Sequence, residues 1–171
     1  DMSRLKMDMV CGQIPDADDD SIVLAFAGAF TGTEFDKGHA NIAGDHVSAG
    51  KRYKGYRCKR NTGAFTWSTA SGPKFYYNYY SSVLDKAAAE GGMAFAQEMI
   101  IHNGKAVKTT RPLGNKNVFR ALCLDHNGKL TLYESQGIVT FGNFIEALLS
   151  QDVKEALYTD MGQGWNYCFY R

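Results

Sequence analysis

The sequence predicts an α+β fold in a single domain, with a mostly antiparallel or mixed β-sheet built from hairpins and two or more packed helices. Segments of strand character outnumber helical ones, and they follow one another through short turns instead of alternating with helices. The turn sequences Asn-Gly at 103–104 and Asp-His-Asn-Gly at 125–128 are hairpin signals. The length of 171 residues matches about one domain.

The first half of the chain has strand character in most of its apolar segments. These segments are residues 22–30, the two parts of 51–67 on either side of a break near 60–63, and residues 75–80. The Gly-, Thr- and His-rich stretch up to about residue 50 is predicted to be a loop. A helix is predicted over 82–90, with Ser81 or Ser82 as its N-cap and Gly91-Gly92 as its end.

The second half contains the clearer local signals. One hairpin is predicted from 93–101 and 105–110 around Asn103-Gly104, and another from 119–124 and 129–135. Apolar residues then recur at helical spacing behind Thr140, namely Phe141, Phe144, Ile145, Leu148 and Leu149, which predicts an amphipathic helix capped by that threonine. A buried strand over 156–160 leads into glycines and an aromatic tail.

Composition excludes several function classes. The 19 Lys and Arg residues nearly balance the 18 Asp and Glu residues, for a formal net charge of +1, which excludes a polybasic nucleic-acid binder. The longest stretch without a polar side chain, residues 22–30, is far shorter than the ~20 residues of a membrane-spanning helix. The chain begins with Asp1, which is typical of a processed protein and leaves export open.

The four cysteines indicate no metal or redox motif. Cys11, Cys58, Cys123 and Cys168 form no C-x-x-C pair, so each is interpreted as a small buried apolar residue, with three disulfide pairings formally open. No H-E-x-x-H or G-x-S-x-G motif is present. No metal ligand set and no cofactor is predicted, and a metal requirement stays open.

A run of cations interleaved with Tyr53 and Tyr56 has three interpretations. Its members are Lys51, Arg52, Lys54, Arg57, Lys59 and Arg60. A solvated strand face is the simplest interpretation, and a local site for a phosphate or acidic sugar is the second, with Arg57 and Arg60 as its ligands because a guanidinium makes forked contacts with phosphate. Tracking of a nucleic-acid backbone is the third, and nucleic acid is the least favoured partner.

Two charged residues lie inside apolar strands. Glu98 would be costly to bury unless it is paired or functional, and both alternatives stay open. Arg120 needs an anionic partner, either a carboxylate of the protein or a ligand phosphate. Period-two alternation places Glu98 and His102 on one face but about 13 Å apart, too far for direct contact, and His102 is predicted to be exposed.

The most informative segment is Ala-Leu-Tyr-Thr-Asp160-Met-Gly162-Gln-Gly164-Trp165-Asn-Tyr167. An acid ends a buried strand, and the glycines after it allow close approach of the backbone to a ligand. A carboxylate beside aromatic rings is typical of a sugar site. The alternative is a turn aspartate that caps its own backbone.

These segments resemble the phosphodiester glycosidase family, which includes the lysosomal uncovering enzyme and many bacterial proteins. The resemblance runs from about residue 22 to the C-terminus and rests on the sequences Gln-Glu98-Met-Ile-Ile-His-Asn-Gly-Lys105, Phe-Arg120-Ala-Leu-Cys and Ala-Leu-Tyr-Thr-Asp160-Met-Gly-Gln-Gly164. A bacterial branch is the nearest fit. The implied organisation is an N-terminal segment, 1–21, followed by a phosphodiester glycosidase-like domain, 22–171.

The resemblance implies a hydrolase that removes a sugar from a sugar-1-phosphodiester, with a small-molecule or glycan substrate, no cofactor and an exported location. Asp160 is expected to be the nucleophile or base, Arg120 to hold the phosphate, and Glu98 to be a second proton-transfer group. The remaining candidates are expected to bind substrate: Asn41, His46, Arg60, Asn61, Gly162 and Trp165. Of these, His46 is also a candidate for proton transfer.

Departures from the family pattern support an alternative. Ala27 stands where the family has asparagine, and Met161 and Gln163 stand where it has glycine. The alternative is a non-catalytic module at the cell surface that binds a glycan or a sugar phosphate.

Overall fold

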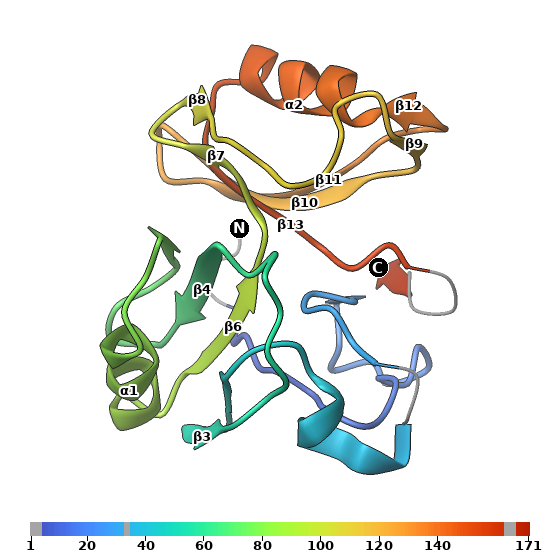
Figure 1. The fold of residues 1–171 in the computed structure, drawn as a ribbon. Helices are drawn as coiled ribbons and strands as arrows, with labels where there is room; N and C mark the ends of the chain where they lie inside the picture. Colours follow the sequence, from blue (N-terminus) through green and yellow to red (C-terminus); the bar gives the residue numbers. More distant parts are fainter. Residues whose placement is uncertain (1–4, 33–34, 163–166) are drawn as a thin grey trace.

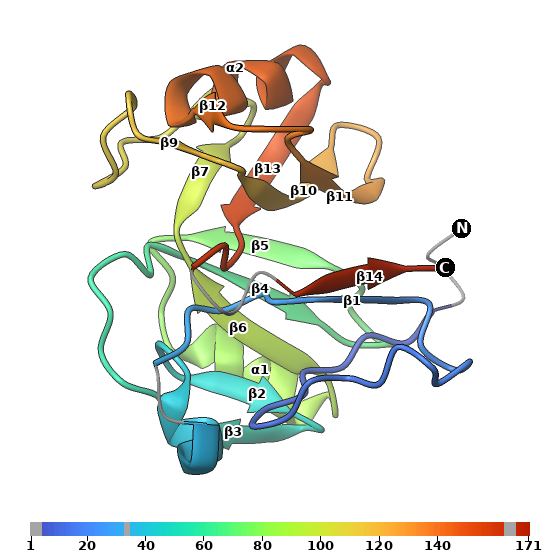
Figure 2. The ribbon, with the colours of Figure 1, turned by 90° about the vertical axis from the view of Figure 1, so that its right-hand side faces the viewer.

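The structure is a computed structural model that describes residues 5–32, 35–162 and 167–171. Two antiparallel five-stranded sheets form its centre (Figures 1 and 2). In spatial order, the first consists of β3 (Lys51–Tyr53), β2 (His46–Ser48), β6 (Met93–Gln97), β4 (Gly63–Trp67) and β5 (Lys74–Tyr77). The second consists of β11 (Leu130–Glu134), β10 (Arg120–Asp125), β13 (Val153–Tyr158), β7 (Met99–His102) and β8 (Lys105–Ala106).

Smaller elements complete the fold. Two-stranded sheets pair β1 (Leu24–Phe26) with β14 (Cys168–Tyr170) and β9 (Lys116–Asn117) with β12 (Val139–Thr140). The helices are α1 (Ser82–Ala89), α2 (Phe141–Ser150) and the kinked 3-10 segment η2 (Phe35–Asn41). The predicted α+β class is thus confirmed.

The molecule is layered as helix, sheet, sheet and helix. The central core lies between the two sheets, where Phe65 and Phe95 of the first pack with Leu122 and Leu157 of the second. The outer face of the second sheet packs on α2, and that of the first packs on α1 (Figure 1). Burial of apolar side chains on both faces of each sheet is the main stabilising contribution.

The chain crosses from one sheet to the other at Glu98, where a single strand over 93–101 was expected. β6 ends at Gln97 and β7 begins at Met99. At the crossing, the Glu98 N–H donates to the Gln97 side chain at 2.7 Å, so this donor is satisfied without a strand partner. Both strands are buried on both faces, so their hydrophobic pattern is continuous through the bend and could not reveal it.

Other expectations for the first half were partly wrong. Only Leu24–Phe26 of the predicted strand over 22–30 is a strand, and β2 lies in the predicted loop. β2 is short, and it is a strand because it pairs with β3 and β6. The helix predicted over 82–90 is confirmed as α1, but its N-cap Ser81 is itself in a helical conformation and makes no capping bond from its side chain.

The hairpin and capping signals of the second half are confirmed. Asn103 and Gly104 have φ angles of 51° and 72° and join β7 to β8, although β8 is much shorter than the predicted strand over 105–110. β10 and β11 pair from Arg120–Glu134 to Leu124–Leu130. The Thr140 hydroxyl accepts the Asn143 N–H at 3.2 Å at the start of α2.

The cysteines are all free thiols and differ in burial. Cys123 is buried in the core as predicted, and burial raises the pKa of its thiol. Cys11 and Cys58 are half-buried, and Cys168 is exposed on β14, so the prediction of a buried residue was wrong there. In the part of the chain that the structure describes, no helix has both the length and the apolar character that a bilayer crossing requires.

Candidate active site

Asp160 lies just beyond the end of β13, at the junction of the two sheets. Its side chain is buried, and its carboxylate accepts the N–H groups of Gly162 at 2.9 Å and of Thr31 at 3.3 Å. Its own N–H donates to the carbonyl of Ala27 at 3.0 Å. The Gly162 bond is the local capping contact considered from the sequence, but Thr31 comes from a distant segment, so the carboxylate joins two parts of the chain.

Burial raises the pKa of Asp160 above the ordinary value for aspartate. The backbone N–H groups of Gly162 and Thr31 and the positive charge of Arg111 all lower this pKa, but the loss of solvation outweighs them. A carboxylate whose proton affinity is increased in this way is a better base once it is ionised.

Glu98 is the most deeply buried carboxylate near this junction, with an exposed fraction of 1%. Neither of its carboxylate oxygens has a hydrogen-bond partner among the described residues. It forms an ion pair with Arg111, with 3.6 Å between Oε2 and Nη2. Glu98 is therefore paired in charge but not saturated in hydrogen bonds, an arrangement that costs stability and leaves acceptors for a ligand.

Arg111 is the functional candidate that sequence reasoning missed. It lies in the segment after β8 with its guanidinium over the rings of Tyr158, at 4.5 Å, and Phe141, at 5.3 Å. Its Nε is buried without a hydrogen-bond partner among the described residues. Arg111 thus pairs directly with Glu98, and its positive charge is the smallest of the influences that lower the pKa of Asp160.

Arg120 has a different environment. It is 3% exposed, and its Nε and Nη2 donate to the Glu134 carboxylate at 2.7 and 2.6 Å. Its Nη1 donates to the carbonyl of Tyr167 at 3.3 Å. Of the two partners considered for it, the structure thus provides a carboxylate of the protein. Its expected role of holding a phosphate stays a prediction.

The expected substrate-binding residues fall into separate places. Asn41 and Asn61 brace the segment that carries Thr31, through bonds from their amides to the carbonyls of Gly32 at 3.2 Å and Ala43 at 2.8 Å. The Asn61 carbonyl oxygen is buried and has no partner among the described residues.

The remaining candidates have individual surroundings. Gly162 lies against Asp160, and Arg60 is exposed in the loop between β3 and β4. His46 is fully buried on β2, where its ring contacts His39 and the carbonyl of Gly44. Trp165 lies outside the described residues.

A cavity of about 310 Å³ lies beside Asn61, with Tyr56 and Arg57 also in its wall. Burial is the main reason that the pKa of Tyr56 is raised, with smaller contributions from Cys58 and the negative charge of Asp160. Arg52, in the same wall, is neutralised by Asp45 and Asp85, each at 2.7 Å. The cationic run also contributes the exposed Arg57 to the wall of this cavity.

Comparison with protein-family models and with curated protein sequences finds no match. Among solved structures, the zebrafish N-acetylglucosamine-1-phosphodiester alpha-N-acetylglucosaminidase catalytic domain, auto-inhibited by its pro-peptide, is similar in fold, with a TM-score of 0.64 and 17% identity. The match covers 86% of this chain and 53% of that one, so the chain spans about half of its neighbour's length. The expected relationship is thereby confirmed as a distant structural one.

Proposed function

We propose that this protein is a phosphodiester glycosidase-like hydrolase that cleaves the bond between the anomeric carbon of a sugar and a phosphate oxygen. The observation that carries the proposal is the buried ion pair of Glu98 and Arg111, which keeps polar atoms without hydrogen-bond partners among the described residues, together with the buried Asp160, on which the charge of Arg111 also acts. Buried charges with unused hydrogen-bonding capacity are typical of functional sites.

Asp160 is the nucleophile or the base that activates water. The N–H groups of Thr31 and Gly162 fix the orientation of its carboxylate. Since burial raises its pKa, the residue binds a proton more strongly than an ordinary aspartate, which makes it a stronger base for proton transfer.

Arg111 stabilises the departing phosphate. A phosphate leaving group is a weak base, so cationic stabilisation can replace much of the protonation that an ordinary glycoside needs. The Nε of Arg111 has an unused donor, and its stacking on Tyr158 holds the guanidinium plane in place. In this proposal Arg111 takes the main role that was expected of Arg120, because Arg120 already binds Glu134. Arg60 and Arg120 stay secondary candidates.

Glu98 is the second proton-transfer group, and the cavity lined by Tyr56, Arg57 and Asn61 receives the sugar or the group attached to the phosphate. The buried side-chain oxygen of Asn61 has no hydrogen-bond partner among the described residues. The sequence resemblance supports three further parts of the proposal. These are roles for Asn41, His46 and Trp165 in substrate binding, membership of a bacterial branch, and export.

The test is hydrolysis of a panel of chromogenic sugar-1-phosphodiesters and plain glycosides by the wild type, by Asp160→Asn and by the control Asp152→Asn, which changes an exposed aspartate. We expect turnover of phosphodiesters only, a fall of roughly 10²–10⁴-fold in Asp160→Asn and no change in the control. Undiminished turnover in Asp160→Asn would disprove the assignment. Binding of sugar phosphates with no turnover of any substrate would favour the non-catalytic module.

A further inference from the structure

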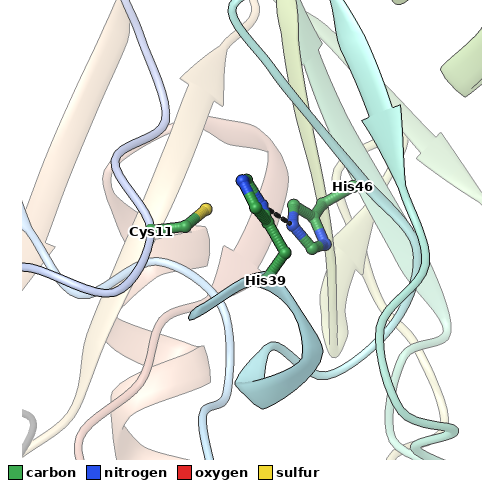
Figure 3. Close-up of side chains that lie close together, drawn as sticks. All are labelled: Cys11, His39 and His46. Atoms are coloured by element: carbon green, nitrogen blue, oxygen red, sulfur yellow. Dashed lines mark hydrogen bonds between the residues drawn. The ribbon is translucent and has the colours of Figure 1, made fainter. Parts of the chain in front are cut away.

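Three side chains that commonly bind metals meet at the end of the first sheet that carries β2. Cys11 comes from the N-terminal segment, His39 from η2 and His46 from β2 (Figure 3). One ligand atom from each, a sulfur and two ring nitrogens, all lie within 4.8 Å of one another.

His46 is oriented as a metal-binding histidine is. The Nδ1 of His46 lies 3.1 Å from the Gly44 carbonyl, which can only accept, so this nitrogen carries the proton and Nε2 presents its lone pair. A bond from the second ring nitrogen to a backbone carbonyl is the usual support of a metal-binding histidine. The His39 Nδ1 lies 2.9 Å from this Nε2.

The surroundings hold both rings in place. His46 is fully buried, and the His39 ring stacks on Tyr53 with 3.4 Å between centroids and 4° between planes. A hydrogen bond between the two histidines accounts for their contact, but it does not account for the thiol that completes the group. Tetrahedral coordination at ordinary Zn–N and Zn–S lengths separates ligand atoms by about 3.3–3.6 Å, so small side-chain shifts would complete the site.

We propose that Cys11, His39 and His46 bind a divalent transition-metal ion of the Zn²⁺ class, with a fourth position open to water. One thiolate and two imidazoles form a ligand set that suits Zn²⁺ and disfavours Ca²⁺ and Mg²⁺, which prefer oxygen. This site is inferred without reference to the proposed hydrolase activity, and its test measures metal binding.

The metal would join the N-terminal segment, through Cys11, to two neighbouring elements, through His39 of η2 and His46 of β2. The Ser48 hydroxyl of β2 donates a hydrogen bond to the Met9 carbonyl at 2.6 Å. Because Met9 lies two residues before Cys11, this bond ties the N-terminal segment to β2. His39 lies two residues before Asn41, whose carbonyl accepts the Gly32 N–H at 2.8 Å beside Thr31. A bound ion would therefore fasten the N-terminal segment and steady the loop that reaches Asp160.

The test uses the reduced full chain, stripped by a chelator and titrated with Co²⁺ as a spectroscopic probe and then with Zn²⁺. We expect one Co²⁺ per chain, a thiolate-to-cobalt charge-transfer band and the intense visible bands of tetrahedral coordination, and a rise in Tm with Zn²⁺. In Cys11→Ser the charge-transfer band should disappear, and in His39→Asn the affinity should fall by at least roughly 10- to 100-fold.

The matched controls are Cys168→Ser and His126→Gln, which change an exposed thiol and an exposed histidine and should retain the band and the Tm shift. Because His46 is buried and its replacement could prevent folding, the test does not depend on it. A wild type that binds no Co²⁺, or a charge-transfer band that persists in Cys11→Ser, would overturn the proposal.

Discussion

Arg111 and Arg120 are both largely buried, but their partners differ. The Arg120 guanidinium shares a short two-nitrogen contact with Glu134 on the neighbouring strand and also binds a backbone carbonyl. Arg111 stands 3.6 Å from Glu98, and its Nε has no hydrogen-bond partner among the described residues. Arg120 thus has hydrogen-bond partners within the fold, whereas Arg111 keeps a donor that the proposed function assigns to a substrate phosphate.

The physical basis of the difference is position in the fold. Arg120 begins β10 directly opposite Glu134 of β11, so the strand register supplies its partner. Arg111 belongs to a connecting segment that returns over Tyr158 and Phe141. The aromatic faces hold the guanidinium through contact with its plane and do not use its N–H donors. The cation is thereby fixed in position and can still donate hydrogen bonds to a ligand.

Of the changes that test the comparison of the two arginines, replacing Arg111 is expected to have the largest effect. In Arg111→Met, we expect kcat on a sugar-1-phosphodiester to fall by roughly 10²–10³-fold, the usual cost of removing one group that stabilises developing charge. The folded state should persist, as judged by circular dichroism. If Arg120→Met lost more kcat than Arg111→Met while its Tm stayed unchanged, the comparison would be reversed and Arg120 would be assigned to the phosphate.

A loss of stability is expected from Glu134→Gln, which removes the carboxylate partner of a buried guanidinium. The free energy of unfolding should fall by about 1–3 kcal/mol, measured by urea denaturation. Turnover per folded molecule should be unchanged. Glu146→Gln on α2 is the control, because its glutamate is exposed and should tolerate the change. Equal stability of the two variants would show that the Arg120 pair is not structural.

A smaller effect on turnover is expected from Glu98→Gln. Because phosphate is a good leaving group, the loss of this proton-transfer group should lower kcat on phosphodiesters by only about tenfold, less than the usual range for general acid–base catalysis. Substrates whose leaving groups are more basic should lose more. A loss that is independent of the leaving-group pKa would instead assign Glu98 to positioning Arg111.

The smallest expected effect is the pH dependence due to Asp160. Its folded pKa is raised above the ordinary value of about 3.9, so the folded state binds the proton more tightly. Its contribution to stability is therefore fully present below about pH 3.9 and is lost as the pH rises through the raised pKa, by about 1.4 kcal/mol for each unit of difference.

Asp160→Asn lacks this titration. Denaturation at several pH values should therefore show that the unfolding free energy of the variant, relative to that of the wild type, increases as the pH rises above about 4. Over the same range the wild-type rate should rise, because the ionised carboxylate is the active form. A constant difference between the two proteins would show that the pKa of Asp160 is not raised.

Local sequence patterns were sufficient for the elements whose signals are short-range. The Asn103-Gly104 turn, the β10–β11 hairpin and the Thr140 cap of α2 depend on residues within a few positions of one another, and each was predicted. Asp160 could be chosen for a similar reason, since an acid between a buried strand and glycines is visible in the sequence.

Long-range packing determined the rest. The crossing at Glu98 is invisible to periodicity because β6 and β7 are buried on both faces. Arg111 stands in a polar stretch resembling a surface loop, and only the return of that loop over Tyr158 places it beside Glu98. Cys11, His39 and His46 likewise match no motif spacing, because Cys11 reaches the two histidines only through packing of the N-terminal segment. Short-range geometry is encoded by neighbouring residues, whereas a site assembled across two sheets depends on how the whole chain packs.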